Sequence, residues 1–477
     1  MINQKEKMDT ICAIATPAGG ALGIIRVSGP EAITAADRIF RPRVGAPLSQ
    51  RAASSLTFGN VVVPQTDEAV DEVLVSLFRA PHSYTGEDSV EFSCHGSYYI
   101  LNKVVELLLA QGCRMARPGE YTERAFLNGK MDLSQAEAVA DLIASTTEAN
   151  HRMAMQQMRG GFSKELRTLR DQLLHITSLL ELELDFSDHE ELEFASRPEL
   201  LALAERIRSH IGALCQSFRL GNALKRGVPV ALVGETNAGK STLLNALVGE
   251  ERALVSNVHG TTRDTIEETV NVGGTLVRFI DTAGIRETSD TVERMGIERA
   301  FDKMAEADIV LWLIDLTVYQ AQYDELAEKI GAQVQGKHLV VLLNKTDLVS
   351  ESTINEAKQY ISGQLNNAVP TPMLLTLSAQ SGSGLDQLKQ LLAASLSTLQ
   401  AENNSTGTIV SNLRHYEALS AALAATDRVI EGLHQGLSGD FVSQDLRECI
   451  YHLSDIVGEV TTDQVLGNIF KHFCVGK

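Results

Sequence analysis

The chain has 477 residues, of which 44% are hydrophobic and 22% are charged, an ordinary globular composition with enough apolar side chains for about three domains. The formal net charge of −19 argues against a surface coated non-specifically with nucleic acid, although one domain can carry a local basic patch. No run approaches the roughly 20 apolar residues of a membrane span, and the first residues lack the apolar core of a signal peptide. Six cysteines without regular spacing favour free thiols in a reducing cytosol, so a cytoplasmic protein is expected.

Residues 1–130 have the pattern of an α+β domain. Apolar, β-branched runs separated by Pro and Gly predict strands at 10–15, 22–27, 60–63 and 72–78. Helical spacing is expected at 97–109 and 119–127. From residue 131 the apolar residues recur at helical spacing, which predicts the first part of a helical domain at 131–225. An acidic stretch at 181–193 within it is interpreted as a solvated face or turn.

A phosphate-binding loop organises the middle of the chain. The apolar run 228–233 precedes G-x-x-x-x-G-K-S at 234–241, and a helix start follows, which is the strand–loop–helix context that this motif requires. The glycines let backbone N–H groups turn toward phosphates at a helix N-terminus. We expect Lys240 to reach the β- and γ-phosphates and the Ser241 hydroxyl to bind Mg²⁺. The loop alone predicts a nucleoside triphosphate without identifying the base.

Three further motifs, at 281–284, 344–347 and 378–379, indicate that the base is guanine. In the N-K-x-D motif, the Asp347 carboxylate can accept from both N1–H and the exocyclic N2–H of guanine, a donor pair that adenine lacks. Four motifs in order, each at a strand end, predict a doubly wound GTPase domain at 226–398. The residues of the three motifs are Asp281, Thr282, Ala283, Gly284, Asn344, Lys345, Thr346, Asp347, Ser378 and Ala379.

Beyond a polar linker at 400–407 helical spacing returns, so 399–477 is expected to be the second part of the helical domain, into which the GTPase is inserted. The chain ends in Cys-Val-Gly-Lys at 474–477. Two cysteine–histidine pairs invite a metal interpretation, but neither supplies four ligands at structural-zinc spacing, so they are interpreted as core and surface residues. These pairs are Cys449 with His452 and Cys94 with His95.

Taken together, the chain resembles the MnmE (TrmE) family, whose members are GTPases that help to modify the wobble uridine of certain tRNAs. The resemblance rests on GIIRVSG at 23–29, SYTGED at 83–88, ARPGEYTERAFLNGK at 116–130, the GTPase motifs and the terminal Cys-x-Gly-Lys. The chain departs from the family pattern at two tolerant positions. Glu235-Thr236 stands where Arg-Pro or similar is usual, and Ser97-Tyr98 follows His95-Gly96 where the family tends to have Gly-Gly.

The resemblance implies a multidomain α/β protein with an α+β tetrahydrofolate-binding-like N-terminal domain, a discontinuous helical domain and an inserted Ras-like GTPase domain. It implies that folate contacts Arg26, Glu91, Lys130 and Lys477, although the first three would otherwise be interpreted as ordinary surface charges. Cys474 would then be a nucleophile or a one-carbon relay. The alternative interpretation of Cys474 is a packed, small hydrophobic residue.

GTP hydrolysis needs a group that orients the attacking water, and Ile285 occupies the position where Ras-like GTPases have a glutamine. The resemblance assigns this role to Glu293, with Arg286 as a second catalytic candidate, while a solvated glutamate at a helix start is the alternative for Glu293. No arginine finger can be identified in the sequence, and the resemblance implies K⁺ in its place. Asn237 would be a side-chain ligand of K⁺, or else a loop residue with unusual backbone angles.

Backbone carbonyls between residues 256 and 261 would complete the K⁺ shell, and a switch threonine would bind Mg²⁺ together with Ser241. The K⁺ ligands of this stretch would be Ser256, Val258 and Thr261, and the switch threonine would be Thr262. The other residues expected to bind GTP are Ala238, Gly239, Thr242, Asn257, His259, Gly260 and Gln380.

The activity that the resemblance implies is a K⁺-dependent GTPase, a homodimer whose GTPase units meet across K⁺ and convert nucleotide state into domain motion. With a flavin-dependent partner of the MnmG (GidA) family, which carries FAD, it would form a heterotetramer. That complex would install an aminomethyl-type group (carboxymethylaminomethyl) at C5 of the wobble uridine of tRNA. The one-carbon unit would come from 5,10-methylene-tetrahydrofolate, of which 5-formyl-tetrahydrofolate is an analogue. The alternative function is a regulatory GTPase in ribosome or RNA assembly, without modification chemistry.

Overall fold

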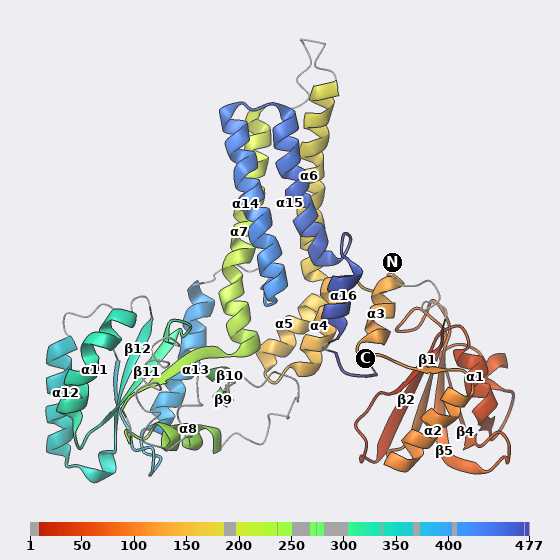
Figure 1. The fold of residues 1–477 in the computed structure, drawn as a ribbon, viewed down its shortest axis with the longest axis horizontal. Helices are drawn as coiled ribbons and strands as arrows, with labels where there is room; N and C mark the ends of the chain where they lie inside the picture. The colour runs from red at the N-terminus through yellow and green to blue at the C-terminus, as the bar shows by residue number, and fades with distance from the viewer. Residues whose placement is uncertain are drawn as a thin grey trace. The chain divides into compact units, whose positions relative to one another are not determined.

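The computed structural model divides into two compact units, which Figure 1 draws without fixing their relative positions. Unit 1 comprises Met1–Ile143, Met155–Gln172 and Ile450–Lys477, and unit 2 comprises Ala144–Ala154 and Leu173–Cys449. The domain ranges expected from the sequence divide the chain differently and stay a prediction. In the described part of the chain, no helix is both long and apolar enough to cross a membrane. The structure describes residues 9–185, 197–235, 237–249, 268–272, 274–280, 304–334, 337–365, 373–402, 408–471 and 473–476.

Unit 1 is built on a seven-stranded sheet with the order β3-β4-β5-β6-β2-β1-β7, in which only the β1–β7 pair is parallel. On β5 the side chains of Val73, Val75 and Leu77 are buried while Leu74 is 42% exposed, the alternation of a sheet with one covered face. Helices α1 (Ala32–Ile39) and α2 (Tyr98–Ala110) pack on this sheet. The strands are β1 (Ile11–Ile14), β2 (Leu22–Ser28), β3 (Phe40–Pro42), β4 (Ser55–Val62), β5 (Ala69–Phe78), β6 (Ser89–His95) and β7 (Arg114–Met115).

The C-terminal segment of the chain also belongs to unit 1, where helix α16 (Asp463–Phe470) packs against α3 (Glu120–Leu127) and α4 (Leu133–Ala144). The apolar contact consists of Leu133 and Ala136 on one side and Leu466, Phe470 and Phe473 on the other. Gly119, with φ of 70°, lets α16 approach the start of α3, because a Cβ there would lie 2.7 Å from the Phe470 carbonyl oxygen. The C-terminal segment therefore shares one core with the residues around α4.

Unit 2 contains a six-stranded sheet with the order β13-β12-β11-β8-β10-β9, parallel throughout except for β9. Strands β8 and β11 are buried along their whole length, as expected where helices cover both faces of a parallel sheet. The strands are β8 (Val228–Val233), β9 (Glu268–Val272), β10 (Thr275–Ile280), β11 (Ile309–Asp315), β12 (His338–Asn344) and β13 (Met373–Thr376). The helices of this part are α8 (Lys240–Gly249), α11 (Tyr319–Gln333), α12 (Glu351–Leu365) and α13 (Leu385–Glu402), with the short η3 (Thr346–Leu348).

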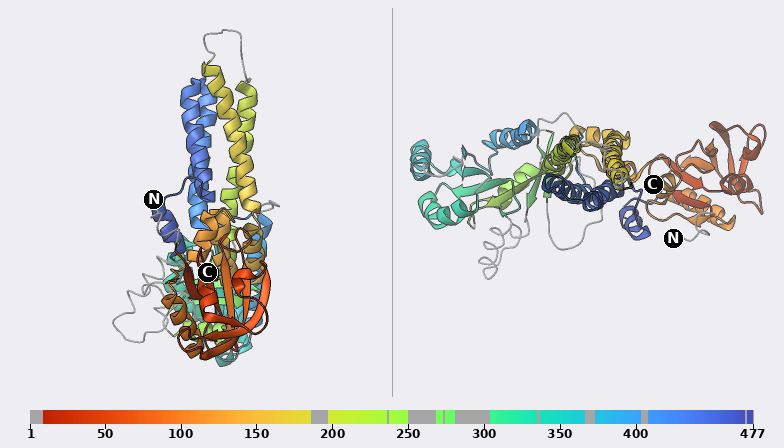
Figure 2. Two further views of the ribbon diagram at one scale, coloured as in Figure 1. Left: turned by 90° about the vertical axis from the view of Figure 1, so that its right-hand side faces the viewer. Right: turned by 90° about the horizontal axis from the view of Figure 1, so that it is seen from above.

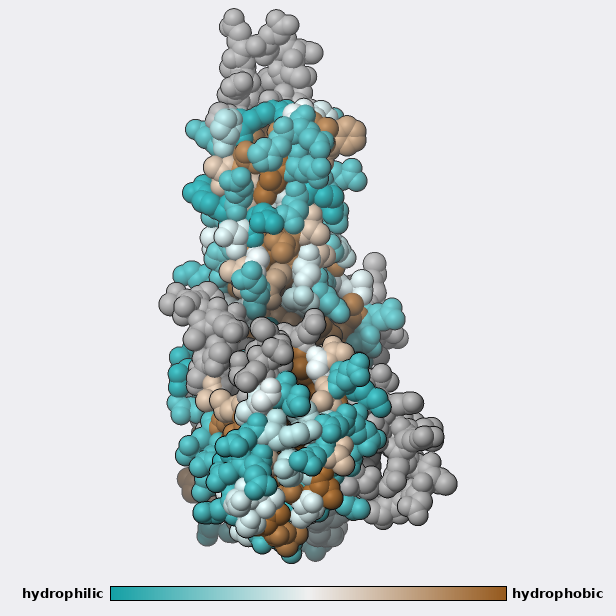
Figure 3. Space-filling model, turned by 90° about the vertical axis from the view of Figure 1, so that its left-hand side faces the viewer, coloured by the Kyte–Doolittle hydropathy of each residue, from teal (hydrophilic) through white to brown (hydrophobic). Residues whose placement is uncertain are grey.

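Long helices make up the rest of unit 2, and α7 (Arg197–Arg226) and α14 (Leu413–Gln435) lie side by side in Figures 1 and 2. Arg208 of α7 pairs with Asp427 of α14. Arg447 of α15 (Gly439–Val457) pairs with Glu181 of α6 (Gly161–Asp185) at 2.5 Å. Hydrophilic residues dominate the described surface of the face in Figure 3, with apolar residues scattered among them. Helix α5 (Glu148–Met158) completes the described helices, and α5, α6 and α15 each contribute to both units.

Replacing Gly119 by alanine should loosen the C-terminal segment, because the added Cβ meets the Phe470 carbonyl and overpacking costs about 1–3 kcal/mol. Gly112 is the matched control, since it also has a positive φ (93°) but a Cβ added there would have nothing within 4 Å. We expect Gly119→Ala to speed hydrogen exchange of the backbone amides in α16, and Gly112→Ala to leave it unchanged. Equal exchange in the two variants would show that the close contact at Gly119 is unimportant.

Candidate functional site

The phosphate loop of unit 2 connects β8 to α8, and its glycines stand where a larger residue would collide. A Cβ on Gly234 (φ 156°) would lie 2.4 Å from the Leu313 carbonyl oxygen, and one on Gly239 (φ 101°) would lie 2.3 Å from Nδ2 of Asn344. Nζ of Lys240 donates to the carbonyl oxygens of Gly234 (2.5 Å) and Glu235 (2.9 Å). The loop thus keeps the lysine at the helix N-terminus, where the motif places the phosphates of a nucleotide.

Asn344, at the end of β12, ties the phosphate loop to the loop after β13. Its side chain is buried, with Nδ2 donating to the Ala238 carbonyl oxygen (2.7 Å) and Oδ1 accepting from the backbone N–H of Ala379 (3.0 Å). One amide therefore holds three of the four sequence motifs together. Ser378 is buried beside Ala379, whereas Asp347 and Gln380 are exposed.

Lys345, the residue after Asn344, adopts a left-handed backbone conformation with φ of 67°. Its Nζ lies 2.6 Å from Oδ2 of Asp315, the last residue of β11. Burial on its own would raise the pKa of Asp315, but hydrogen bonds from Lys345 and Thr317 outweigh it and hold the pKa below its usual value. The aspartate is therefore a fixed anion that positions the lysine of the N-K-x-D motif.

The remaining phosphate-loop residues suit the predicted cations in their chemistry. Ser241 and Thr242 are exposed in the first turn of α8, next to Lys240, where a hydroxyl oxygen is the type of ligand that Mg²⁺ prefers. Asn237 is exposed with φ of 64°, a conformation that asparagine tolerates, so both interpretations of Asn237 stay open. The other predicted site residues of this unit lie outside the described residues: Ser256, Asn257, Val258, His259, Gly260, Thr261, Thr262, Asp281, Thr282, Ala283, Gly284, Arg286 and Glu293.

In unit 1, Arg26 on β2 and Glu91 on β6 face each other in the antiparallel register. Nε of Arg26 lies 2.8 Å from Oε1 of Glu91, and the two side chains are 17% and 25% exposed. The guanidinium group lies 5.5 Å from the ring centroids of both Tyr84 and Tyr121, and the Tyr121 hydroxyl donates to the Arg26 carbonyl oxygen (2.8 Å). Two predicted folate contacts thus form one half-buried ion pair with aromatic neighbours.

The C-terminal tail reaches this ion pair. Nη1 of Arg26 donates to the Gly476 carbonyl oxygen (3.3 Å), and the backbone N–H of Gly119 donates to the Cys474 carbonyl oxygen (3.3 Å). Gly476 has φ of 94°, and a Cβ there would lie 2.7 Å from the Ile14 carbonyl oxygen, so only glycine fits against β1. Cys474 is exposed.

Of the other two residues that we expect to contact folate, the structure describes only Lys130. Lys130 is exposed and donates from Nζ to the Pro81 carbonyl oxygen (2.8 Å), in the same loop that carries Tyr84. Lys477 lies outside the described residues.

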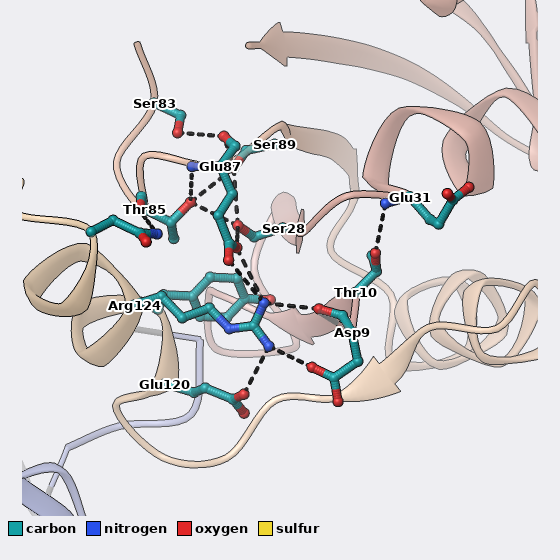
Figure 4. A network of polar contacts seen from close by, with 12 residues as sticks. Asp9, Thr10, Ser28, Glu31, Ser83, Thr85, Glu87, Ser89, Glu120 and Arg124 are labelled. Carbon is teal, nitrogen blue, oxygen red and sulfur yellow. Dashed lines mark hydrogen bonds and ion pairs between the residues drawn. The ribbon is translucent and has the colours of Figure 1, made fainter. Parts of the chain in front are cut away.

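A buried polar network supports the loop that carries Tyr84, and Arg124 of α3 lies at the centre of this network (Figure 4). Arg124 is 6% exposed and pairs with Asp9 (2.8 Å), Glu87 (3.2 Å) and Glu120 (3.1 Å). Burial would raise the pKa of Glu120, but hydrogen bonds from Arg114 and the Arg117 backbone, with the charge of Arg124, hold its pKa at about 2.

Glu87 links this network to the loop, because it also accepts from the Ser28 hydroxyl (2.8 Å) and its carbonyl accepts from the Ser83 hydroxyl (2.5 Å). The network therefore fixes the segment on which Tyr84 stands. Neither Arg124 nor Tyr84 was given a role from the sequence. The available signal was the charged spacing at 120–124, which puts Glu120 and Arg124 one helical turn apart.

A doubly wound sheet with this phosphate loop and the N-K-x-D motif, in a chain that also has an α+β sheet and long helices, defines a multidomain P-loop GTPase. The family model described as MnmE helical domain matches residues 133–474, and that described as GTP-binding protein TrmE N-terminus matches residues 10–130. The chain belongs to the MnmE family of tRNA modification GTPases. The resemblance inferred from the sequence motifs, the multidomain α/β class and the GTPase assignment are thereby confirmed.

Relatives match along almost the whole chain. The tRNA modification GTPase MnmE of Bacteroides fragilis is 58% identical over 470 residues, which cover 98% of this chain and 99% of that protein. The protein of the same name from Christiangramia forsetii is 48% identical over 476 residues, with the same coverage of 98% and 99%. Among solved structures, the G domain of the T. maritima FeoB iron transporter is 24% identical and covers 35% of this chain and 97% of that domain, with a TM-score of 0.24.

Guanine specificity should depend on Asp347. The substitution Asp347→Asn replaces a charged acceptor for two guanine donors, an interaction worth about 1.5–3 kcal/mol, so GTP affinity should fall by roughly 10- to 150-fold while xanthine nucleotides gain affinity. Titrations with GDP, GTP and XTP measure this change. Asp386→Asn, at another exposed aspartate of unit 2, is the control and should leave all three affinities unchanged. Unaltered GTP binding by Asp347→Asn would remove this residue from base recognition.

Proposed function

We propose that this chain is a K⁺-dependent GTPase that acts as a homodimer in the cytoplasm, together with a flavin-dependent partner of the MnmG (GidA) family. The complex adds an aminomethyl-type group, carboxymethylaminomethyl, at C5 of the wobble uridine of certain tRNAs. Unit 1 binds 5,10-methylene-tetrahydrofolate, which would supply the one-carbon unit. The name of the relatives, tRNA modification GTPase, supports the tRNA and the GTP in this proposal.

The proposal that unit 1 binds folate rests on one observation. Arg26 contacts both Glu91 and the C-terminal tail. A pterin presents ring N–H and amino donors, for which the Glu91 carboxylate is a suitable acceptor, and folate carboxylates suit guanidinium and ammonium groups. The Arg26–Glu91 pair keeps part of its surface exposed, and Tyr84, 37% exposed, adds an aromatic ring beside it. These donors, acceptors and ring fit the group chemically.

The tail brings an exposed thiol to the same surface. The Cys474 backbone is held by Gly119, and the Gly476 carbonyl is held by Arg26. Chain ends fray unless they are tied down, so these contacts favour a role for the tail beyond ending the chain. We propose that Cys474 acts on the one-carbon unit as a nucleophile or relay, with Lys477 and Lys130 contacting the folate.

For hydrolysis, we propose that K⁺ supplies the positive charge of an arginine finger, with Asn237 as a ligand from the phosphate loop. Ile285 has no polar group to orient water, so Glu293 is proposed for that role, with Arg286 beside it. Support for this part comes from the sequence and from the exposed position of Asn237 at the rim of the loop.

The cation dependence gives a direct test. The GTPase rate should be markedly higher in KCl than in NaCl at equal ionic strength, and Asn237→Ala should abolish the difference while nucleotide binding stays largely intact. Because φ of Asn237 is 64°, alanine adds backbone strain, so Asn237→Gly is the strain-free variant and should lose the K⁺ stimulation equally. Equal rates of the unaltered protein in the two salts would mean that the protein supplies the missing charge itself.

The tail gives the test of the modification chemistry. Deleting residues 474–477 should leave GTP hydrolysis near normal but abolish wobble-uridine modification in the reconstituted reaction with the flavin-dependent partner, measured by mass spectrometry of tRNA nucleosides. Cys474→Ser should also abolish modification if the exposed thiol takes part in the chemistry, and retain it if only the backbone contacts of the tail matter. Continued modification by the truncated chain would refute a role for the tail.

A further inference from the structure

Helix α7 belongs to two parts of unit 2 at once. Its last turns contribute Leu220, Ala223 and Leu224 to the hydrophobic core of the GTPase sheet, together with residues of β8 and β10. Its earlier turns pack against α14, where Arg208 pairs with Asp427. Because a helix is a rigid element, these 30 residues join the GTPase sheet to the long helices as one rod.

The two chain segments that connect the GTPase domain to the long helices are fastened to each other at one turn of α7. The buried Ser217 hydroxyl oxygen accepts from the backbone N–H of Val410 (3.0 Å), in the segment between α13 and α14. A Cβ on Gly221 would lie 2.0 Å from the Val410 carbonyl oxygen, so glycine permits this close approach. The Phe218 ring stacks on that of Tyr416 of α14, with centroids 4.4 Å apart and an interplanar angle of 16°. We therefore expect this turn of α7 and the start of α14 to move together.

The same turn of α7 contacts the GTPase domain through an ion pair. Nη2 of Arg219 lies 2.8 Å from Oδ1 of Asp308, the residue before β11. The backbone N–H of Asp308 donates to the Pro229 carbonyl oxygen in β8, and its carbonyl oxygen accepts from the N–H of His338 in β12, both at 3.0 Å. The carboxylate that Arg219 binds is thus anchored to three strands of the GTPase sheet.

Asp308 ends a short segment, residues 304–308, that a single lysine holds. Nζ of Lys337 donates to three carbonyl oxygens of this segment, which uses all three donors of the ammonium group. These are the carbonyl oxygens of Met304 (2.5 Å), Ala305 (2.6 Å) and Ala307 (2.9 Å). In the sequence, the segment follows the D-x-x-G motif at 281–284, where GTPases respond to the γ-phosphate. A change that reaches residues 304–308 along the chain therefore arrives at the ion pair of Asp308.

We propose that Arg219 is a positioning residue that sets the angle between α7 and the GTPase sheet, so that a change of nucleotide state reaches α14. When residues 304–308 shift, Arg219 follows its partner Asp308. Ser217 and Phe218, on the same turn, then pass the shift to the start of α14. None of these residues belongs to a nucleotide-binding motif, so their replacement should leave hydrolysis itself unchanged. This role requires GTPase activity alone and is independent of the folate and tRNA chemistry proposed above.

Hydrogen exchange of the full chain, measured by mass spectrometry, tests this coupling. The samples contain Mg²⁺, KCl and either GDP or GDP with aluminium fluoride, a mimic of the transition state of hydrolysis. In the unaltered protein, the backbone amides of residues 408–416 should exchange at different rates in the two states, because this stretch contacts Ser217 and Phe218. Arg219→Ala should reduce that difference by about 2- to 5-fold, the scale of one exposed ion pair, with kcat and KM for GTP within about twofold.

Arg208→Ala is the matched control, because both arginines stand on α7 with side chains that are 53% exposed, but the partner of Arg208 lies on α14. This variant should keep the full difference between the two nucleotide states. Asp308→Asn removes the other half of the ion pair and should reduce the difference as much as Arg219→Ala does. Arg219→Lys retains a cation for the single contact with Asp308 and should keep the difference.

The proposal is overturned if Arg219→Ala or Asp308→Asn keeps the full nucleotide-dependent difference. It is equally overturned if Arg208→Ala loses the difference to the same extent, since that would show a general loosening of α7. Identical exchange of residues 408–416 in the two states of the unaltered protein would show that nucleotide state does not reach α14. A lower Tm of Arg219→Ala with an unaltered difference would leave Arg219 a structural role alone.

Discussion

The nucleotide site depends on how closely the phosphate loop approaches the end of β12. The buried amide of Asn344 spans this contact, bonding Ala238 on one side and Ala379 on the other, and it fits only because Gly239 has no Cβ. Parallel strands bring their carboxyl ends to one edge of the sheet, so motifs more than a hundred residues apart meet there. A single neutral side chain then fixes their spacing before any nucleotide binds.

In unit 1, ion pairs between charged side chains fix the position of a loop in the same way. Arg124 and Glu120 are buried and the Glu87 side chain is 18% exposed, and pairing is needed because an unpaired buried charge costs several kcal/mol. The pairing fixes the loop that carries Tyr84, and with it the surroundings of Arg26. Gly119 lets the C-terminal segment approach the start of α3, and Gly476 lets it lie against β1.

The sequence predicted best what depends on local backbone chemistry. The phosphate loop needs glycines beside a strand and a helix, so its spacing alone located β8 and α8, and apolar runs located β1, β2 and β5. Strand β6, which presents Glu91, was not predicted, although Val90, Phe92 and Cys94 alternate there with polar residues as in a strand that buries one face. Gly476 contacts Arg26, which lies 450 positions earlier in the sequence. The family resemblance suggested that the tail lies near Arg26, and no local pattern did. Arg124 gave only the charged spacing at 120–124 as a signal, since its partners Asp9 and Glu87 are distant in sequence.

The polar contacts described in the two units differ in the free energy that it costs to break them. This difference predicts which parts of the protein move. Breaking one partner out of a buried ion pair costs about 3–5 kcal/mol, whereas a neutral hydrogen bond contributes about 0.5–1.5 kcal/mol net. The surroundings of Arg124 are therefore expected to stay fixed through a reaction cycle. The two amide contacts of Asn344, to Ala238 and Ala379, are neutral hydrogen bonds of this weaker kind. Conformational response to GTP is thus expected in the loops that neutral amides hold, while the surface beside Arg26 keeps its geometry.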